Sequence, residues 1–366
     1  MSYVDAPRGS ALLVILGAGA SFDAVSDLSL DRRPPLTNGL VSDSNLTRAV
    51  LQKYPRATPV YDYLNREIKG SSWGDKAQSL EGSLRRYQSL AHANPLVTSH
   101  MSAFRFYLRD LLFDASKNVV QQRSRVTNFV TLARECVQWS RETGRIVCFV
   151  SFNYDPLLEW GLQQVDRFEP LNLADYVAGP NYYVVKPHGS ILWNWPDTSQ
   201  EFGYDIQALS HAIEDGDPDN LPNPPIITSA TSTNLVSVGA AKRYSCYPAI
   251  ALPYDTGKNF VWPKEQDDLF ADPKLLTTET TFSSGIFGRV LSIGWRGSEP
   301  HFLERLRRLL APSADFWTVT QGDRSHDEVV DALKSLSPYA GVVYREGGFS
   351  TFLDDKALPT VFDWSP

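Results

Sequence analysis

Six short apolar runs constrain the fold of this chain more than any other feature of its sequence. They cover residues 11–16, 145–151, 182–186, 288–294, 315–320 and 341–344. Runs of this length that end in glycine or polar residues are typical of buried parallel strands. Amphipathic helical patterns lie between several of them, at residues 100–113, 126–139 and 302–310. Strands that alternate with helices predict an α/β fold with a doubly wound, Rossmann-like parallel sheet.

Two long segments interrupt this alternation. Residues 22–140 are mostly helical in pattern, and we interpret them as a helical insertion packed on a sheet domain made of residues 11–21 and 141–366. Residues 196–287 hold nine of the 24 prolines together with Ser, Thr, Asn and Asp clusters. This composition predicts a loop-rich insertion rather than a separate domain.

Charge, hydropathy and cysteine content argue against several classes of protein. The net charge of −7 argues against nucleic-acid binding, which needs clustered Lys and Arg. No apolar run approaches the roughly 20 residues that cross a bilayer, so no membrane association is expected. The first ten residues lack a secretory pattern, which makes a cytoplasmic location the expectation. With only Cys136, Cys148 and Cys246, a four-cysteine zinc site is impossible and no metal is expected.

A glycine-rich turn, Gly17-Ala18-Gly19-Ala20-Ser21, directly follows the first apolar run. Glycine lets a backbone come close to a pyrophosphate, and the amides that follow can begin a helix whose positive end faces an anion. The full GxGxxG pattern is absent, because position 22 is Phe. The turn is therefore either a dinucleotide-binding turn or a tight strand-to-helix connection without a ligand.

Two polar residues and a glycine mark the ends of three further runs. Asn153 follows the second run, His188 the third, and Gly294 ends the fourth. The carboxyl ends of parallel strands share one edge of the sheet, so we expect these residues to lie close together. The Asn153 amide can hold a ribose hydroxyl or a water. His188 suits proton transfer near neutral pH.

Asp155 and Arg296 each have more than one interpretation, whereas Ser298 has one. Asp155 precedes Pro156, a pattern that predicts a helix N-cap at least as strongly as a role in catalysis. Arg296 suits a phosphate contact and an exposed loop cation equally well. Ser298 is expected to cap the helix that begins near Pro300.

Taken in order, these motifs resemble the sirtuin family, and more closely the sirtuin-like NADases of bacterial antiphage defence. The matching segments are Gly17–Ser21, the Pro- and Leu-rich loop 33–40, Asn153-Tyr154-Asp155, His188-Gly189, Ile293-Gly294-Trp295 and the stretch 346–353. The resemblance implies an NAD⁺ cradle built from Gly17, Ala18, Gly19 and Ser21. It also implies that Asn153 positions the nicotinamide ribose and a water, and that His188 acts as a base or polariser. Gly294 would line the ribose or adenine end, with Asp155 and Arg296 as further candidate contacts.

The departures from the sirtuin pattern narrow the predicted activity. Deacylating sirtuins carry a four-cysteine zinc ribbon between the His-Gly pair and the later glycine, an interval that here holds only Cys246. We therefore expect an NAD⁺ glycohydrolase that uses NAD⁺ as its substrate, needs no zinc, and depletes NAD⁺ in abortive infection. The alternatives are an NAD-dependent deacylase or ADP-ribosyltransferase, and a non-catalytic module that senses NAD⁺ or ADP-ribose.

The resemblance also bears on partners. Many defence NADases carry a fused sensor domain, and the predicted sheet and insertions leave little room for one in this chain. The expectation is a homo-oligomer, a separate sensor protein such as a HerA-type ATPase, or both. This expectation follows from the family likeness and from no residue pattern in the chain.

Overall fold

The computed structural model describes most of the chain. The described residues are 11–70, 80–90, 94–122, 126–196, 226–227, 235–238, 241–244, 246–252, 264–271, 285–337 and 341–363. The predicted loop-rich insertion therefore lies largely outside the described residues.

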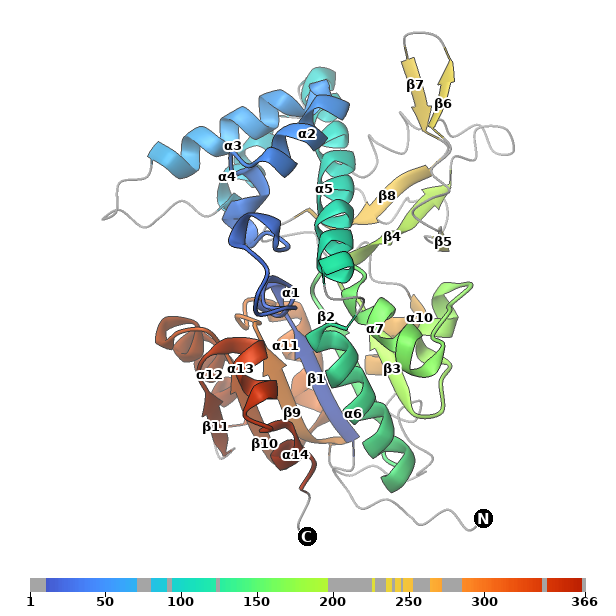
Figure 1. Cartoon of the computed structure of the whole chain (residues 1–366), viewed down its shortest axis with the longest axis vertical. Helices are drawn as coiled ribbons and strands as arrows, with labels where there is room; N and C mark the ends of the chain where they lie inside the picture. The colour runs from blue at the N-terminus through green and yellow to red at the C-terminus, as the bar shows by residue number, and fades with distance from the viewer. Residues whose placement is uncertain are drawn as a thin grey trace.

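A six-stranded parallel sheet forms the centre of the lower body in Figure 1, and its strands contain or overlap all six apolar runs. In spatial order they are β11 (Val342–Arg345), β10 (Leu310–Val319), β9 (Phe287–Ile293), β1 (Ala11–Leu16), β2 (Val147–Ser151) and β3 (Tyr182–Val185). The chain runs outward from β1 through β2 to β3, then returns to β9 on the other side of β1. This order confirms the doubly wound, Rossmann-like fold and puts its topological switch point between β1 and β9.

Helices cover both faces of the sheet. Leu12, Val14 and Leu16 of β1 face one apolar core, and Leu13 and Ile15 face the other, because successive side chains of a strand point to opposite sides. The first core is closed by α6 (Asn128–Thr143), α7 (Leu157–Asp166), α13 (Gly348–Asp354) and α14 (Leu358–Phe362). The second is closed by α10 (Lys264–Ala271), α11 (Pro300–Leu309) and α12 (Asp323–Leu336).

Helix α6 has clear start and stop signals. At its start the Thr127 side chain accepts a hydrogen bond from the Val130 amide at 3.4 Å. At its end Gly144 takes a left-handed conformation with φ +68°, which glycine adopts without strain. The predicted domain boundary at residue 140 falls inside α6. This helix directly precedes β2 in the chain and packs against it.

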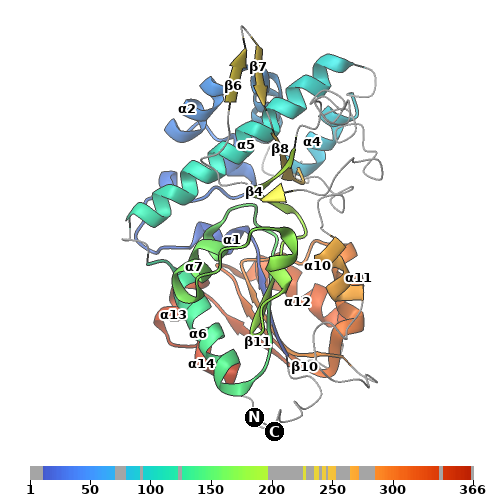
Figure 2. The same cartoon turned by 90° about the vertical axis from the view of Figure 1, so that its right-hand side faces the viewer.

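A second group of elements lies beyond the carboxyl edge of the sheet, at the top of Figures 1 and 2. Its helices are α2 (Asn45–Lys53), α3 (Thr58–Gly70), α4 (Leu80–Gln88) and the 28-residue α5 (Pro95–Gln122). Its strands are β4 (Gly189–Pro196), β5 (Ile226–Ile227) and β8 (Cys246–Ile250) in one antiparallel sheet, and β6 (Leu235–Val238) with β7 (Ala241–Tyr244) in another. Its short 3-10 helices are η1 (Leu30–Arg32), η2 (Thr37–Val41) and η3 (Pro55–Ala57), whereas η5 (Leu173–Val177) packs on β3 and α10 in the sheet body.

Strand β4 was not predicted from the sequence, although it begins directly after His188. It connects the sheet edge to the upper group and pairs with β8, and the Phe106 ring of α5 meets the Tyr247 ring of β8 at 5.5 Å. Within the described ranges, no helix combines the length and apolar character needed to cross a bilayer.

Candidate functional site

The glycine turn after β1, in which Gly17 precedes the short helix α1 (Ala18–Phe22), packs against the end of β9 at the switch point. The Gly17 amide donates to the Ile293 carbonyl at 3.0 Å, and the Gly19 amide donates to the Gly294 carbonyl at 3.1 Å. A Cβ atom at Gly17 would lie 2.4 Å from the Gly294 carbonyl oxygen, and Gly294 itself has φ +61°. Glycine at these positions is thus required for two backbone turns to meet. Ala18, between the two glycines, is the exposed residue of the turn.

Asn153 is bound to this turn from the neighbouring strand end. Its Nδ2 donates to the Gly17 carbonyl and to the Ser21 hydroxyl, both at 2.8 Å, and the residue is 6% exposed. A carbonyl can only accept, so the Gly17 contact fixes which way the amide group points. Both amide hydrogens are committed, which leaves the Oδ1 atom as the acceptor that Asn153 offers.

His188 lies beside the two residues that flank Asn153. Its ring centroid is 5.0 Å from that of Phe152 and 6.2 Å from that of Tyr154. The Ile191 amide donates to the Tyr154 carbonyl at 2.9 Å and so ties the two strand-end loops together. The structure therefore brings the loops of Asn153 and His188 into contact, as expected for the ends of adjacent parallel strands.

The end of β9 contributes an aromatic group to the same region. Trp295 stacks on Phe152 with ring centroids 5.8 Å apart, and its indole nitrogen donates to the Glu299 carboxylate at 2.6 Å. Helix α11 begins at Pro300 with Glu299 as its N-cap residue. The expected cap at Ser298 is wrong, because the Ser298 hydroxyl instead donates to the Glu299 carboxylate at 3.1 Å.

Asp155 is buried beneath the glycine turn and the start of α7. Its carboxylate accepts the Leu157 amide at 3.2 Å, so it does serve the helix N-terminus, although the helix begins at Leu157 rather than at Pro156. Burial raises the pKa of the Asp155 carboxyl above its usual range, while the charge of Lys186 and the hydrogen bond from Ser21 oppose that rise. The Ser21 hydroxyl thus connects the Asn153 amide to the Asp155 carboxylate.

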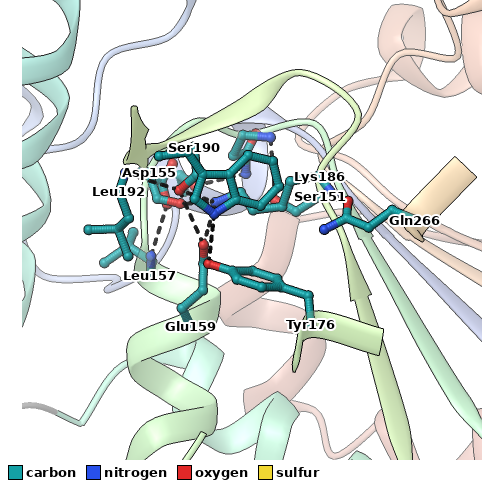
Figure 3. Close-up of polar contacts among 12 residues, drawn as sticks. Ser151, Asp155, Leu157, Glu159, Tyr176, Lys186, Ser190, Leu192 and Gln266 are labelled. Carbon is teal, nitrogen blue, oxygen red and sulfur yellow. Dashed lines mark hydrogen bonds and ion pairs between the residues drawn. The ribbon is translucent and has the colours of Figure 1, made fainter. Parts of the chain in front are cut away.

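Lys186 is a functional candidate that sequence reasoning missed, and its surroundings are shown in Figure 3. Its ammonium group donates to the Asp155 carbonyl at 2.7 Å, to the Glu159 carboxylate at 2.8 Å and to the Ser190 hydroxyl at 3.4 Å. The Lys186 side chain is 0% exposed and that of Glu159 is 4% exposed. The Lys186 backbone amide is bound in turn by the Gln266 side chain of α10 at 2.9 Å.

Tyr176 of η5 completes this buried cluster beside Glu159. Its hydroxyl accepts a hydrogen bond from the Trp193 indole at 3.1 Å and also bonds to the Glu159 carboxylate. Burial raises the pKa of Tyr176 well above its usual value, and the Glu159 charge adds to that rise, so the phenol stays protonated. One sequence signal pointed here: Lys186 is a charged residue that directly ends an apolar run.

Arg296 is the remaining candidate at this edge, and Cys136 and Cys148 lie in the cores away from it. Arg296 is exposed in the loop between β9 and α11. Cys136 and Cys148 are buried and free, and burial raises the pKa of both thiols. Over the described part of the chain, no group of three or more His, Cys, Asp or Glu side chains is arranged to hold a metal ion.

Comparison with protein-family models and with curated protein sequences found no match to this chain.

Proposed function

We propose that this chain is an NAD⁺ glycohydrolase that releases nicotinamide and ADP-ribose, with a sirtuin-like site at the carboxyl edge of its sheet. The observation that carries the proposal is the fixed orientation of Asn153 at the β1/β9 switch point. Its amide hydrogens are held by Gly17 and Ser21, and its loop contacts His188. In folds of this class, nucleotides bind in the crevice at the switch point.

The chemistry requires little acid assistance. The C1′–N1 bond of NAD⁺ breaks with both electrons going to the ring nitrogen, which converts the pyridinium into neutral nicotinamide. The ribose is left as an oxocarbenium-like cation, water attacks C1′, and one proton is released. The protein has to orient the ribose, shield the cation and deliver the water.

The residues at the edge suit these tasks. Asn153 Oδ1 is a fixed acceptor for a ribose hydroxyl or for the attacking water. His188 is suited to accept the proton that the water loses. Phe152 and Trp295 stack on each other beside His188, and together with Tyr154 they form an aromatic surround suited to excluding competing water.

The glycine turn is the candidate contact for the pyrophosphate of NAD⁺. Gly17 and Gly19 come close to protein backbone, and both amides are engaged there. We therefore assign the pyrophosphate to the exposed Ala18 side of the turn, with Arg296, which is also exposed, as a candidate phosphate contact. Ser21 and Asp155 support Asn153 from below rather than contact the substrate.

The biological setting we propose is antiphage defence, and it rests on the motif resemblance alone. NAD⁺ depletion would be switched on through a homo-oligomer or through a separate sensor protein such as a HerA-type ATPase. Light scattering of the purified chain, alone and with such a partner, measures either assembly.

Incubation of the protein with NAD⁺, followed by chromatography of nicotinamide and ADP-ribose, tests the proposal. Asn153→Ala and His188→Ala are each expected to reduce the rate by about 10²–10⁴-fold, the usual contribution of a positioned general base or orienting group. His100→Asn is the matched control, because His100 lies in α5 and bonds to Tyr87 at 2.9 Å, away from the site. Turnover that survives both site substitutions would show the assignment to be wrong.

Calorimetric titration with NAD⁺ and chromatography of the products together separate the alternative functions. Tight NAD⁺ binding with no products in any oligomeric fraction or with the partner would favour a sensing module. NAD⁺ loss that requires an acyl-lysine peptide or a protein acceptor would favour a deacylase or ADP-ribosyltransferase.

A further inference from the structure

The Lys186 ammonium group lies between the two strand-end loops of the candidate site. It donates to the Asp155 carbonyl, two residues after Asn153, and to the Ser190 hydroxyl, two residues after His188. Lys186 itself follows β3, the strand that leads to His188. The Lys186 side chain therefore bonds to both loops, in each case to the residue two positions after the candidate catalytic residue.

The chemistry of the ammonium group makes this contact rigid. An ammonium has three hydrogens, and three acceptors lie within 3.4 Å of Lys186 Nζ. The third acceptor, the Glu159 carboxylate, compensates the buried charge at 2.8 Å. With the side chain fully buried and each hydrogen bonded in a different direction, the group has little freedom to move.

The bond to Asp155 continues to Asn153 itself. The Asp155 carboxyl accepts from the Ser21 hydroxyl, and that hydroxyl accepts from Asn153 Nδ2 at 2.8 Å. A shift of the Asp155 backbone would move the group that orients the Asn153 amide.

We propose that Lys186 is a positioning residue that sets the spacing between the loops carrying Asn153 and His188, through its bonds to Asp155, Ser190 and Glu159. This inference rests on the proposed function where it treats Asn153 and His188 as the reacting pair. Misplacing a reacting group by about 1 Å costs on the order of 10²-fold in rate, so such a residue matters without contacting the substrate.

The test uses the full chain with the double substitution Lys186→Met/Glu159→Gln. This variant keeps the volume of both side chains and leaves no uncompensated charge from the pair, so its fold is expected to survive. Arg289→Met is the matched control, because Arg289 is also a buried cation but lies near the amino end of β9. Ser190→Ala is a second, milder variant that removes one acceptor and keeps the ion pair.

Two readouts are measured on each folded protein. The first is the NMR signal of the His188 ring and of the Asn153 side-chain amide, which needs no turnover. The second is kcat and KM for NAD⁺. The double variant is expected to shift both NMR signals and to lower kcat by about 10²-fold with KM within about threefold. Arg289→Met is expected to change neither readout.

Unchanged His188 and Asn153 signals in the folded double variant would overturn the inference. Should that variant not fold, Ser190→Ala decides: a shifted His188 signal supports the inference and an unchanged one overturns it. A wild-type chain that neither binds nor hydrolyses NAD⁺ in any oligomeric fraction or with the partner contradicts the proposed function instead, and the NMR comparison still decides the positioning role.

Discussion

Two buried cations lie toward opposite ends of the same sheet, and they are held in different ways. Lys186, after β3, is bound by a carbonyl, a carboxylate and a hydroxyl from three separate segments. Arg289, near the amino end of β9, donates to the Val361 carbonyl of α14 at 2.6 Å and lies 5.0 Å over the Trp317 ring. The first joins strand-end loops, and the second holds the C-terminal helix against the sheet.

The two cations also differ in what their loss is expected to cost the folded state. Lys186 has a carboxylate at 2.8 Å and no exposed surface, so loss of either partner leaves a buried charge. Arg289 stacks on an aromatic ring and bonds to a helix-terminal carbonyl, contacts that cost less to lose. Burial lowers the pKa of Arg289, while Asp315 and Asp363 oppose the shift. Substitutions of Lys186 and of Arg289 therefore test whether a buried cation at the carboxyl edge affects activity as well as stability, and whether one at the amino edge affects stability alone.

The largest effect is expected for Lys186→Met alone. Removing the cation leaves the Glu159 carboxylate buried without its charge partner, which costs about 3–5 kcal/mol of unfolding free energy. Urea denaturation followed by circular dichroism measures it. The double variant with Glu159→Gln should recover most of the lost unfolding free energy. If it does not, the buried charge of Glu159 is not the cause of the loss.

A smaller loss is expected for Arg289→Met. The variant gives up the hydrogen bond to the Val361 carbonyl and the contact over Trp317, together worth about 1–3 kcal/mol. Hydrogen exchange should show faster opening of α14 and no change at the loops after β2 and β3. Equal loosening at both edges would remove the contrast between the two cations.

The smallest effect concerns pH and Asp155. Burial raises the pKa of this carboxyl in the folded state above the unfolded value of about 4. Below pH 4 the carboxyl is protonated in both states, and its stabilising contribution is fully present. As the pH rises through the folded pKa that contribution is lost, so wild type should lose stability relative to Asp155→Asn and then level off.

Denaturation of both proteins at several pH values above 4 provides the measurement. A gap between wild type and variant that does not change with pH, or that favours wild type as the pH rises, would contradict the direction of the shift. The second outcome would mean that the Lys186 charge, rather than burial, dominates at Asp155.

Much of the sheet could be predicted from the sequence. The six apolar runs correspond to the six strands, and the helical patterns at residues 100–113, 126–139 and 302–310 fall largely within α5, α6 and α11. The prediction succeeded for the inner strands because a strand buried on both faces needs a continuous apolar run, whereas β11 is an edge strand whose residues are half-buried or exposed. Strand β10 extends back to Leu310, five residues before its run, because pairing with β9 resumes beyond a register shift.

The site could be predicted only in part. Asn153, His188 and Gly294 were expected at one edge because they follow parallel strands, and the structure places the Asn153 loop against both the His188 loop and the β9 end. Glu159 could not be found, because its partner Lys186 is 27 residues further along the chain. Nothing local marks a glutamate on the inner side of a helix as half of an ion pair.

The sequence by itself determined the periodicity of this protein: where strands and helices run, and which polar residues follow a strand. Only the tertiary structure decided what those residues contact, because hydrogen bonds and charge pairs form between segments that lie far apart in the chain. The glycine turn shows this most clearly. Its glycines suggested close approach to a ligand, yet they are required by the backbone of β9, which the sheet order brings beside β1.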